Sequence, residues 1–289
     1  MAETAIRTDA YRLVLPSVWR SGVVVSSPHS GRDYPERLLR RTGLDTRQMR
    51  SSEDAFVDRL FDAVPLIGAP LLAAVAPRAW IDLNRGEEEL DPALITGLRP
   101  RALNPRVSAG LGVVPRVVAG GRAIYSGKLD VSEAEERIAT HWRPYHARLS
   151  QLMYEAHEDF GRAVLFDVHS MPHEALEALG PRPPEVVLGD RYGASADQRI
   201  VELAEAAFRA EGLRVSRNTP FAGAYITQSY GRPSMGRHAV QIEIDRALYM
   251  DEVSIRPSPE FENFRLMIGR VMGRIIAGLG QESGSLAAE

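Results

Sequence analysis

The 289-residue sequence contains no cysteine. Disulfide bonds, thiolate nucleophiles and sulfur-ligated zinc sites are therefore excluded, and any metal must be held by His, Asp or Glu. The sequence also lacks an apolar run of about 18 residues, which argues against a membrane span. Its net charge of −3 shows no basic excess that would indicate a nucleic-acid partner. The N-terminus has no apolar core followed by a cleavage site, so we expect no secretion signal and a cytoplasmic protein.

Short apolar runs alternate with longer amphipathic segments, a pattern typical of an α/β fold. The runs predict strands at 22–27, 71–76, 79–83, 163–169, 185–190 and 238–244. Helices are predicted at 132–160, 195–212 and 260–280. The first has a capping-box pattern, Ser132 followed by Glu135, and Pro144 is expected to kink or split it. The second is expected to begin at a Ser or Asp cap and to end at Gly212.

Two segments show neither the alternation of a strand nor the periodicity of an amphipathic helix. Residues 97–122 are dense in Gly, Pro and Arg, and they are interpreted either as a lid over an active site or as a surface insertion without order. The tail, 281–289, is expected to be disordered. No repeat or linker divides the chain, so residues 1–289 are expected to form one catalytic domain.

Two histidines follow buried strands in the same way. His29 follows the apolar run in "VVVSSPHSGRDYP", and His169 lies at the end of the apolar run in "AVLFDVHSMP". Histidines at the carboxyl ends of such strands are expected to meet at one edge of the sheet, where open α/β sheets place their ligand sites. Asp167 shares a strand face with His169 and could orient its imidazole. A lone histidine that hydrogen-bonds a turn is the alternative for His29.

A third metal ligand is expected to be a carboxylate, because catalytic zinc sites with two histidines and one acid keep a position open for water. The nearest acids are Glu53 and Asp54 in "SSEDAFVDRLFDAV", where Ser51 or Ser52 could cap a helix. Acids in a first helical turn commonly serve the helix dipole instead. Spacing alone leaves the choice between the two open.

The segment "HAVQIEIDR" offers a general base. Gln241, Glu243 and Asp245 share the strand face opposite the apolar residues, and a carboxylate on a buried strand calls for a function. The alternative is an edge strand whose polar face is solvated.

The segment "RAWIDLNRG" places Asn84 and Arg85 after a predicted strand. The planar guanidinium of Arg85 suits a bidentate contact with a substrate carboxylate. A structural ion pair between Arg85 and Asp82 or Asp91 is the alternative.

Together these segments resemble the N-formylglutamate amidohydrolase (N-formylglutamate deformylase) family, whose fold is related to that of zinc carboxypeptidases. The resemblance runs from about Val23 to Glu252, and its motifs occur in the family's order: "SSPHSGRDYP", "SSEDAFVDRLFD", "RAWIDLNRG", "HWRPYHARL", "FDVHS", "FAGAYITQSYG" and "HAVQIEIDRALYMDE". It implies a three-layer α/β sandwich with a mixed, largely parallel central sheet. Ala224 and Tyr225 depart from the Gly-His pair of some members, and the 97–122 segment differs from the shorter deformylases, so both bear on the identity of the substrate.

The resemblance also implies roles for individual residues. Zn²⁺ or another divalent metal would be held by His29, Asp54 and His169, with Glu53 at a threonine position of the family. Glu243 would be the general base, and the carboxylates of the substrate would be bound by Arg85, assisted by Asn84 and Arg237.

The implied reaction is hydrolysis of N-formyl-L-glutamate, a small acidic N-acyl amino acid, to formate and L-glutamate in histidine degradation. A deacylase or carboxypeptidase acting on another acyl-amino acid or peptide is the enzymatic alternative, and a ligand-binding relative without activity is the other. A serine hydrolase is disfavoured because the chain has no Gly-x-Ser-x-Gly motif.

Overall fold

One eight-stranded sheet organises the chain, for which the computed structural model describes residues 4–98 and 104–286. In spatial order its strands are β1 (Thr4–Arg7), β2 (Tyr11–Leu15), β4 (Leu71–Ala74), β3 (Val23–Ser27), β9 (Ala163–Met171), β12 (Arg237–Asp245), β10 (Val186–Gly189) and β11 (Val215–Arg217). Strands β4, β3, β9 and β12 run parallel, β2 is antiparallel to both β1 and β4, and β10 is antiparallel to β12 but parallel to β11. The mixed, largely parallel sheet is therefore confirmed.

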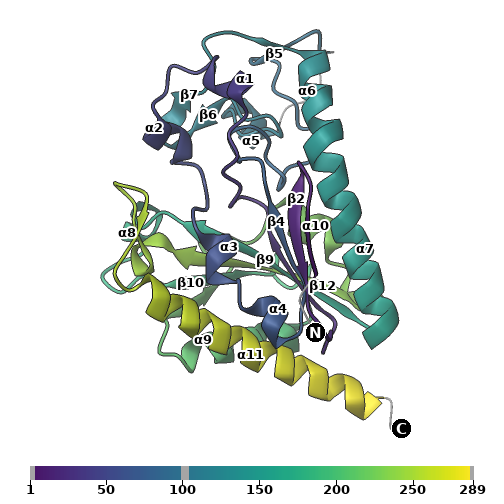
Figure 1. Ribbon diagram of the computed structural model, residues 1–289. Helices are drawn as coiled ribbons and strands as arrows, with labels where there is room; N and C mark the ends of the chain where they lie inside the picture. The colour runs from purple at the N-terminus through teal and green to yellow at the C-terminus, as the bar shows by residue number, and fades with distance from the viewer. Residues whose placement is uncertain (1–3, 99–103, 287–289) are drawn as a thin grey trace.

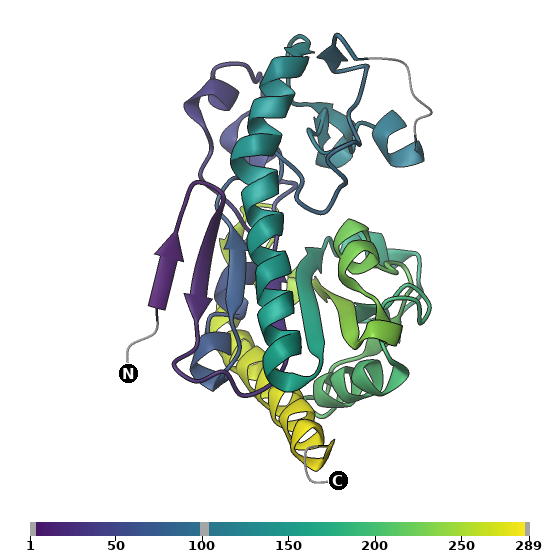
Figure 2. The same ribbon diagram turned by 90° about the vertical axis from the view of Figure 1, so that its right-hand side faces the viewer.

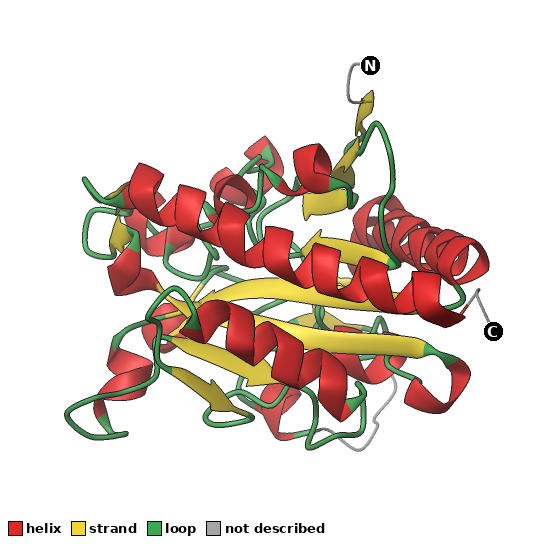
Figure 3. Cartoon of the chain, turned by 90° about the horizontal axis from the view of Figure 1, so that it is seen from below, coloured by secondary structure: helices red, strands yellow, loops and turns green. Residues whose placement is uncertain are grey.

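Helices cover both faces of this sheet, as the secondary-structure colours of Figure 3 show. One face carries α3 (Val57–Leu60), α4 (Val64–Ile67), α9 (Gln198–Arg209) and α11 (Phe261–Leu286). The other carries α6 (Val131–Arg137), the π-helical turn η2 (Ile138–Trp142), α7 (Arg143–Phe160) and α10 (Tyr225–Tyr230). Figure 2 shows α6, η2 and α7 as one long helical path that runs alongside the strands of the sheet. Two apolar layers thus flank the sheet and give the predicted three-layer sandwich.

Short elements gather above the sheet, at the end of the molecule far from the C-terminus (Figure 1). They are α1 (Glu36–Leu39), α2 (Thr46–Arg50), β5 (Ile95–Thr96), α5 (Pro105–Ser108), β6 (Val117–Val118), η1 (Ala119–Gly121), β7 (Arg122–Ala123) and β8 (Leu129–Asp130). The remaining short elements are α8 (Glu174–Glu177), η3 (Pro233–Met235), η4 (Arg246–Leu248), β13 (Met250–Asp251) and β14 (Arg256–Pro257). No helix in the described ranges combines the length and apolarity needed to cross a membrane.

The central strands are buried on both faces, which explains their nearly continuous apolar sequences. In β9 the side chains alternate, so Phe166 and Val168 enter the α11 layer while Asp167 and His169 face the α7 side. Strand β12 lies between β9 and β10, so the alternative of a solvated edge strand around Glu243 is wrong.

Several predicted boundaries need correction. The segment 79–83 is not a strand but a series of turns that begins at Pro77, whose carbonyl accepts hydrogen bonds from Trp80 and Ile81. The cap of α6 is Asp130 rather than Ser132, because the Asp130 carboxylate accepts the Ser132 N–H.

Two expectations about helix ends also change. Pro144 lies in the first turn of α7, directly after the π-helical turn η2, so it marks a junction in one continuous helical path. Helix α11 continues to Leu286, so the predicted disordered tail is wrong for 281–286, and 287–289 lie outside the described residues. The cap of α9 is Asp197, as the sequence allowed.

Candidate metal centre and catalytic cavity

The two strand-end histidines do meet. The rings of His29 and His169 lie edge to face with centroids 4.8 Å apart, and both side chains are buried. Their Nδ1 atoms point at the same carboxylate, with Asp54 Oδ2 3.4 Å from His29 and 2.9 Å from His169. The alternative of an isolated turn histidine is therefore wrong for His29.

Each histidine has a carboxylate behind its other nitrogen. His29 Nε2 lies 2.7 Å from Asp82 Oδ1, and His169 Nε2 lies 2.8 Å from Asp167 Oδ2. A carboxylate accepts a hydrogen bond, so each Nε2 carries a proton and Nδ1 is the ring atom that faces the centre of the site. The role of Asp167 was predicted, whereas that of Asp82 was missed because sequence spacing suggested only a pairing with Arg85.

Asp54 is the acid that joins the histidines. It lies in the turn that precedes α3, after α2 has ended, and not in the first turn of a helix as expected. Its backbone N–H donates to the His29 carbonyl at 3.0 Å, which fixes the two segments together. Glu53 instead contacts Tyr34 and Arg50, so it lies outside the cluster.

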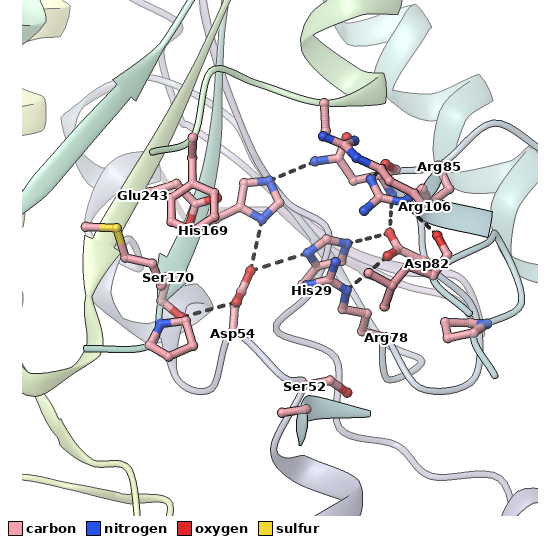
Figure 4. Close-up of a pocket in the computed structure, with 18 of the residues that line it drawn as sticks. His29, Ser52, Asp54, Arg78, Asp82, Arg85, Arg106, His169, Ser170 and Glu243 are labelled. Atoms are coloured by element: carbon pink, nitrogen blue, oxygen red, sulfur yellow. Dashed lines mark hydrogen bonds and ion pairs between the residues drawn. The ribbon is translucent and has the colours of Figure 1, made fainter. Parts of the chain in front are cut away.

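The second oxygen of Asp54 is held from the opposite side. Asp54 Oδ1 accepts hydrogen bonds from Ser170 Oγ and Arg246 Nη2, each at 3.2 Å. Arg246 also donates to Ser170 and to the Glu53 carbonyl. This network orients Oδ2 toward the two imidazoles (Figure 4).

These three residues fit a divalent metal. One ligand atom from each of His29, Asp54 and His169 lies within 4.8 Å of the others, and all three side chains are buried. His29 Nδ1 is a buried polar atom without a hydrogen bond among the described residues, which is what a missing metal bond would leave. Two neutral imidazoles and one carboxylate are the donor set of catalytic zinc sites with an open position.

Charge in the metal-free cluster is tightly coupled. Burial disfavours the ionised Asp54, but the imidazoles of His169 and His29 outweigh it and hold the pKa of that carboxyl well below its usual value. Burial likewise disfavours the charged His169, but Asp167 and Asp54 raise the pKa of its imidazole well above the usual value. A metal must displace the His169 proton, so metal binding is expected to release protons and to weaken as the pH falls.

Glu243 faces His169 directly across the parallel β9–β12 pair. Burial, opposed by the charge of His169 and assisted by that of Asp54, raises the pKa of the Glu243 carboxyl to about 7. Gln241 donates to Glu243 Oε1 at 2.8 Å, which orients the carboxyl. A carboxyl that titrates near neutrality beside a metal position is suited to proton transfer in both directions.

Arg85 lies at the cavity, where the predicted contact with a substrate carboxylate places it, and the alternative of a structural ion pair is wrong. The guanidinium of Arg85 lines the cavity and donates to the carbonyls of Leu111 and Asn84, at 3.0 and 2.8 Å. In the described part of the chain it forms no ion pair with Asp82 or Asp91, which pair with Arg78 and Arg116. Burial lowers the pKa of Arg85 because it removes water from around the guanidinium.

The amide of Asn84 is fully engaged within the protein. Its nitrogen lies 3.3 Å from Asp167 Oδ2 and 3.2 Å from His169 Nε2, and its oxygen accepts the Ile226 N–H at 2.8 Å. Asn84 therefore positions the Asp167–His169 pair, a contact that the predicted substrate-binding role did not include.

The expected contribution of Arg237 needs correction. Arg237 begins β12, while Glu243 lies six residues further along that strand, a separation of about 20 Å in extended backbone. Arg237 lines a separate hollow between α7 and α10, with Trp142, Tyr225 and Tyr230. Functional side chains collect at the carboxyl ends of the parallel strands, and Arg237 lies at the opposite end.

The cluster opens into a cavity of about 700 Å³. Its outer wall includes Arg106 and residues 117–121, so the described part of the 97–122 segment borders the site and is not an insertion without order. The segment is anchored by an Arg116–Asp91 ion pair and by a hydrogen bond from Asn104 to Glu89. Residues 99–103 lie outside the described residues. The sequence reasoning missed both Arg78 and Arg106 as residues of the cavity, and the density of arginine in 97–122 was the available signal for Arg106.

Comparison with known proteins agrees with this geometry. The sequence model of the N-formylglutamate amidohydrolase family matches residues 21–250. An N-formylglutamate deformylase of Pseudomonas aeruginosa is 32% identical over 81% of this chain and 84% of its own length. One from Pseudomonas putida is 31% identical over 81% of this chain and 83% of its own length.

A solved structure extends the likeness to three dimensions. The crystal structure of N-formylglutamate amidohydrolase from Ralstonia eutropha JMP134 superposes with a TM-score of 0.89 at 35% identity, covering 95% of this chain and 100% of that one. The buried cluster, the fold and these relatives together show that the chain belongs to the N-formylglutamate amidohydrolase family, hydrolases that act on amide bonds.

Proposed function

We propose that the chain is a single-domain, metal-dependent amidohydrolase that cleaves N-formyl-L-glutamate to formate and L-glutamate. The observation that carries this proposal is the convergence of His29, Asp54 and His169 beside a buried Glu243. The names of the relatives support the substrate. We also propose that the reaction serves histidine degradation in the cytoplasm.

His29, Asp54 and His169 would hold the metal, and Zn²⁺ is the ion that this donor set favours. Bound there, a divalent ion supplies Lewis-acid polarisation of the formyl carbonyl and activation of the attacking water. Asp82 and Asp167 keep the two imidazoles in the tautomer that presents Nδ1.

Glu243 moves the protons. As a carboxylate it accepts a proton from the attacking water, and as an acid it returns that proton to the departing amide nitrogen. Both protonation states are accessible near neutrality because burial raises its pKa to about 7. Gln241 holds the carboxyl in place during both transfers.

The test is a substrate panel with purified, zinc-loaded protein. N-formyl-L-glutamate, N-acetyl-L-glutamate, N-formyl-L-leucine and a glutamyl dipeptide are supplied in parallel, and release of formate, acetate or free amino acid is measured. The proposal expects N-formyl-L-glutamate to have the highest kcat/KM. Preferred release of acetate or of a dipeptide product would identify another deacylase or a carboxypeptidase, and no turnover of any substrate would favour a binding protein.

A further inference from the structure

Two arginines of the cavity wall form no ion pair among the described residues, although the charge of Asp82, which is paired with Arg78, favours the charged form of Arg85. Arg85 donates only to backbone carbonyls, and across the described residues no ion pair joins Arg106 to a carboxylate. Figure 4 shows the two side chains next to each other, and their charges repel, which contributes to the lowered pKa of Arg85 after burial. We call Arg85 and Arg106 the arginine wall.

The other two cavity arginines are different. Arg78 donates to Asp82 Oδ2 at 3.0 Å, and Arg246 donates to Asp54 Oδ1 at 3.2 Å. Each therefore balances an acid of the metal cluster. Glu89, whose charge also reaches Arg85, is occupied by the Gly86 N–H and by Asn104. The arginine wall is left as the part of the cavity with unbalanced positive charge.

A single residue fixes the two arginines relative to each other. The Leu111 carbonyl accepts the Arg85 Nε–H at 3.0 Å, and the Leu111 N–H donates to the Arg106 carbonyl at 2.8 Å. Asn104 caps the short helix that carries Arg106 by accepting the Val107 N–H. The pair is thus built into the fold, because the Arg85 side chain and the Arg106 backbone both bond to Leu111 of one anchored segment.

The two arginines lie at different depths. Arg85 is buried, with 6% of its surface exposed, and it contacts the Asn84 backbone, whose side chain touches His169. Arg106 is exposed on the outer wall. In N-formylglutamate the α-carboxylate is attached to the carbon that bears the scissile amide, and the γ-carboxylate lies at the far end of the side chain.

We propose that Arg106 is a specificity residue that binds the side-chain carboxylate of the substrate, while Arg85 binds the α-carboxylate. This inference rests on the proposed function. It means that selection for an acidic side chain comes from the 104–122 segment. The metal-binding residues and Glu243 then do not distinguish substrates by their side chains. A guanidinium on the outer wall of the cavity would discriminate between a γ-carboxylate and its amide, which has the same shape without the charge.

The experiment compares N-formyl-L-glutamate with N-formyl-L-glutamine in wild type, Arg106→Gln and Arg122→Gln. Arg122 is an exposed arginine of the same segment that does not line the cavity, so its substitution is a matched loss of charge. The ratio of kcat/KM for the two substrates is expected to fall by roughly tenfold in Arg106→Gln, the size of one hydrogen bond to a charged group. Arg122→Gln is expected to keep the wild-type ratio.

Equilibrium binding separates this inference from the proposed function. Titration calorimetry of zinc-loaded protein with L-glutamate and with L-glutamine needs no turnover, and wild type is expected to prefer L-glutamate while Arg106→Gln loses that preference. If wild type fails to release formate but this binding pattern holds, the proposed function is wrong and the carboxylate site stands. If Arg106→Gln keeps the wild-type selectivity in both measurements, or if Arg122→Gln loses it equally, Arg106 is not the specificity residue.

Discussion

The two sides of the cavity are built on different principles. The strand-end cluster (His29, Asp54, His169 and Glu243) is buried, and its charges are balanced by Asp82, Asp167, Arg78 and Arg246. Of the arginine wall, Arg85 lies in a turn and Arg106 in the short helix α5, and neither forms an ion pair among the described residues.

The difference shows how the chain separates chemistry from selection. Groups that hold a metal or move a proton need fixed geometry, which a sheet edge provides. Groups that choose among substrates need an unmet charge, which a substrate carboxylate then neutralises. The substitutions below test each side by removing one contact at a time.

The largest effect is expected at Glu243. Glu243→Gln preserves the shape of the side chain and removes the proton acceptor, so kcat is expected to fall by roughly 10²–10⁴-fold while the metal stays bound. Asp245→Asn is the matched control, because Asp245 shares the strand face but contacts His173 away from the cavity. Formate release by a Glu243→Gln protein at the wild-type rate would remove this residue from the reaction.

The carboxylates behind the histidines come next. Asp82→Asn and Asp167→Asn replace the charged acceptor beside each imidazole with a neutral amide, and metal affinity is expected to drop by roughly 10–100-fold. Competition with a chromogenic chelator measures the change. Unaltered affinity in both variants would mean that the imidazole tautomers are set by other contacts.

Arg85→Lys is expected to lower kcat/KM by roughly tenfold to a hundredfold, because an ammonium cannot reproduce the planar fork that grips a carboxylate. If Arg85 binds the α-carboxylate, the kcat/KM values for N-formylglutamate and N-formylglutamine fall by the same factor. In Arg106→Gln, by contrast, the ratio of the two values changes. The melting temperature is followed in parallel. A lower melting temperature with unchanged efficiency would assign Arg85 to the fold alone.

The last prediction concerns the stability of the folded protein. The folded-state pKa of Glu243 is raised from 4.5 to about 7, so folding favours its protonated form. This preference is fully present below the unfolded pKa and is lost as the pH rises through about 7. Because a pKa that rises from 4.5 to about 7 corresponds to about 3 kcal/mol, metal-free Glu243→Gln should gain about 3 kcal/mol in unfolding free energy over metal-free wild type between pH 4.5 and 8. Denaturant titrations at several pH values measure the two unfolding free energies. A difference between the two proteins that stays constant over this pH range would contradict the prediction.

The predictable parts of the molecule share a physical cause. His29 and His169 follow apolar strands whose carboxyl ends must share one sheet edge, so local sequence determines their meeting. Glu243 was predictable because a carboxylate on a buried strand is costly without a partner.

Other contacts depend on packing between distant segments. Asp82 reaches His29 only because 79–83 forms turns and not a strand, and Arg106 enters the cavity through a backbone contact with Leu111. Arg237 was misassigned because sequence gives a residue's position in a strand but not the distance that the strand spans. Spacing along the chain carries none of these three facts.

Metal content tests the central claim most directly. Elemental analysis of purified wild type, His169→Ala and His157→Ala is expected to find one divalent ion per chain in wild type and in His157→Ala. His157 is half-buried, does not line the cavity and contacts the Met235 carbonyl. His169→Ala is expected to contain almost none while keeping the folded circular dichroism spectrum. Stoichiometric metal in a folded His169→Ala protein, or wild type that binds no divalent ion when it is supplied, would contradict the account.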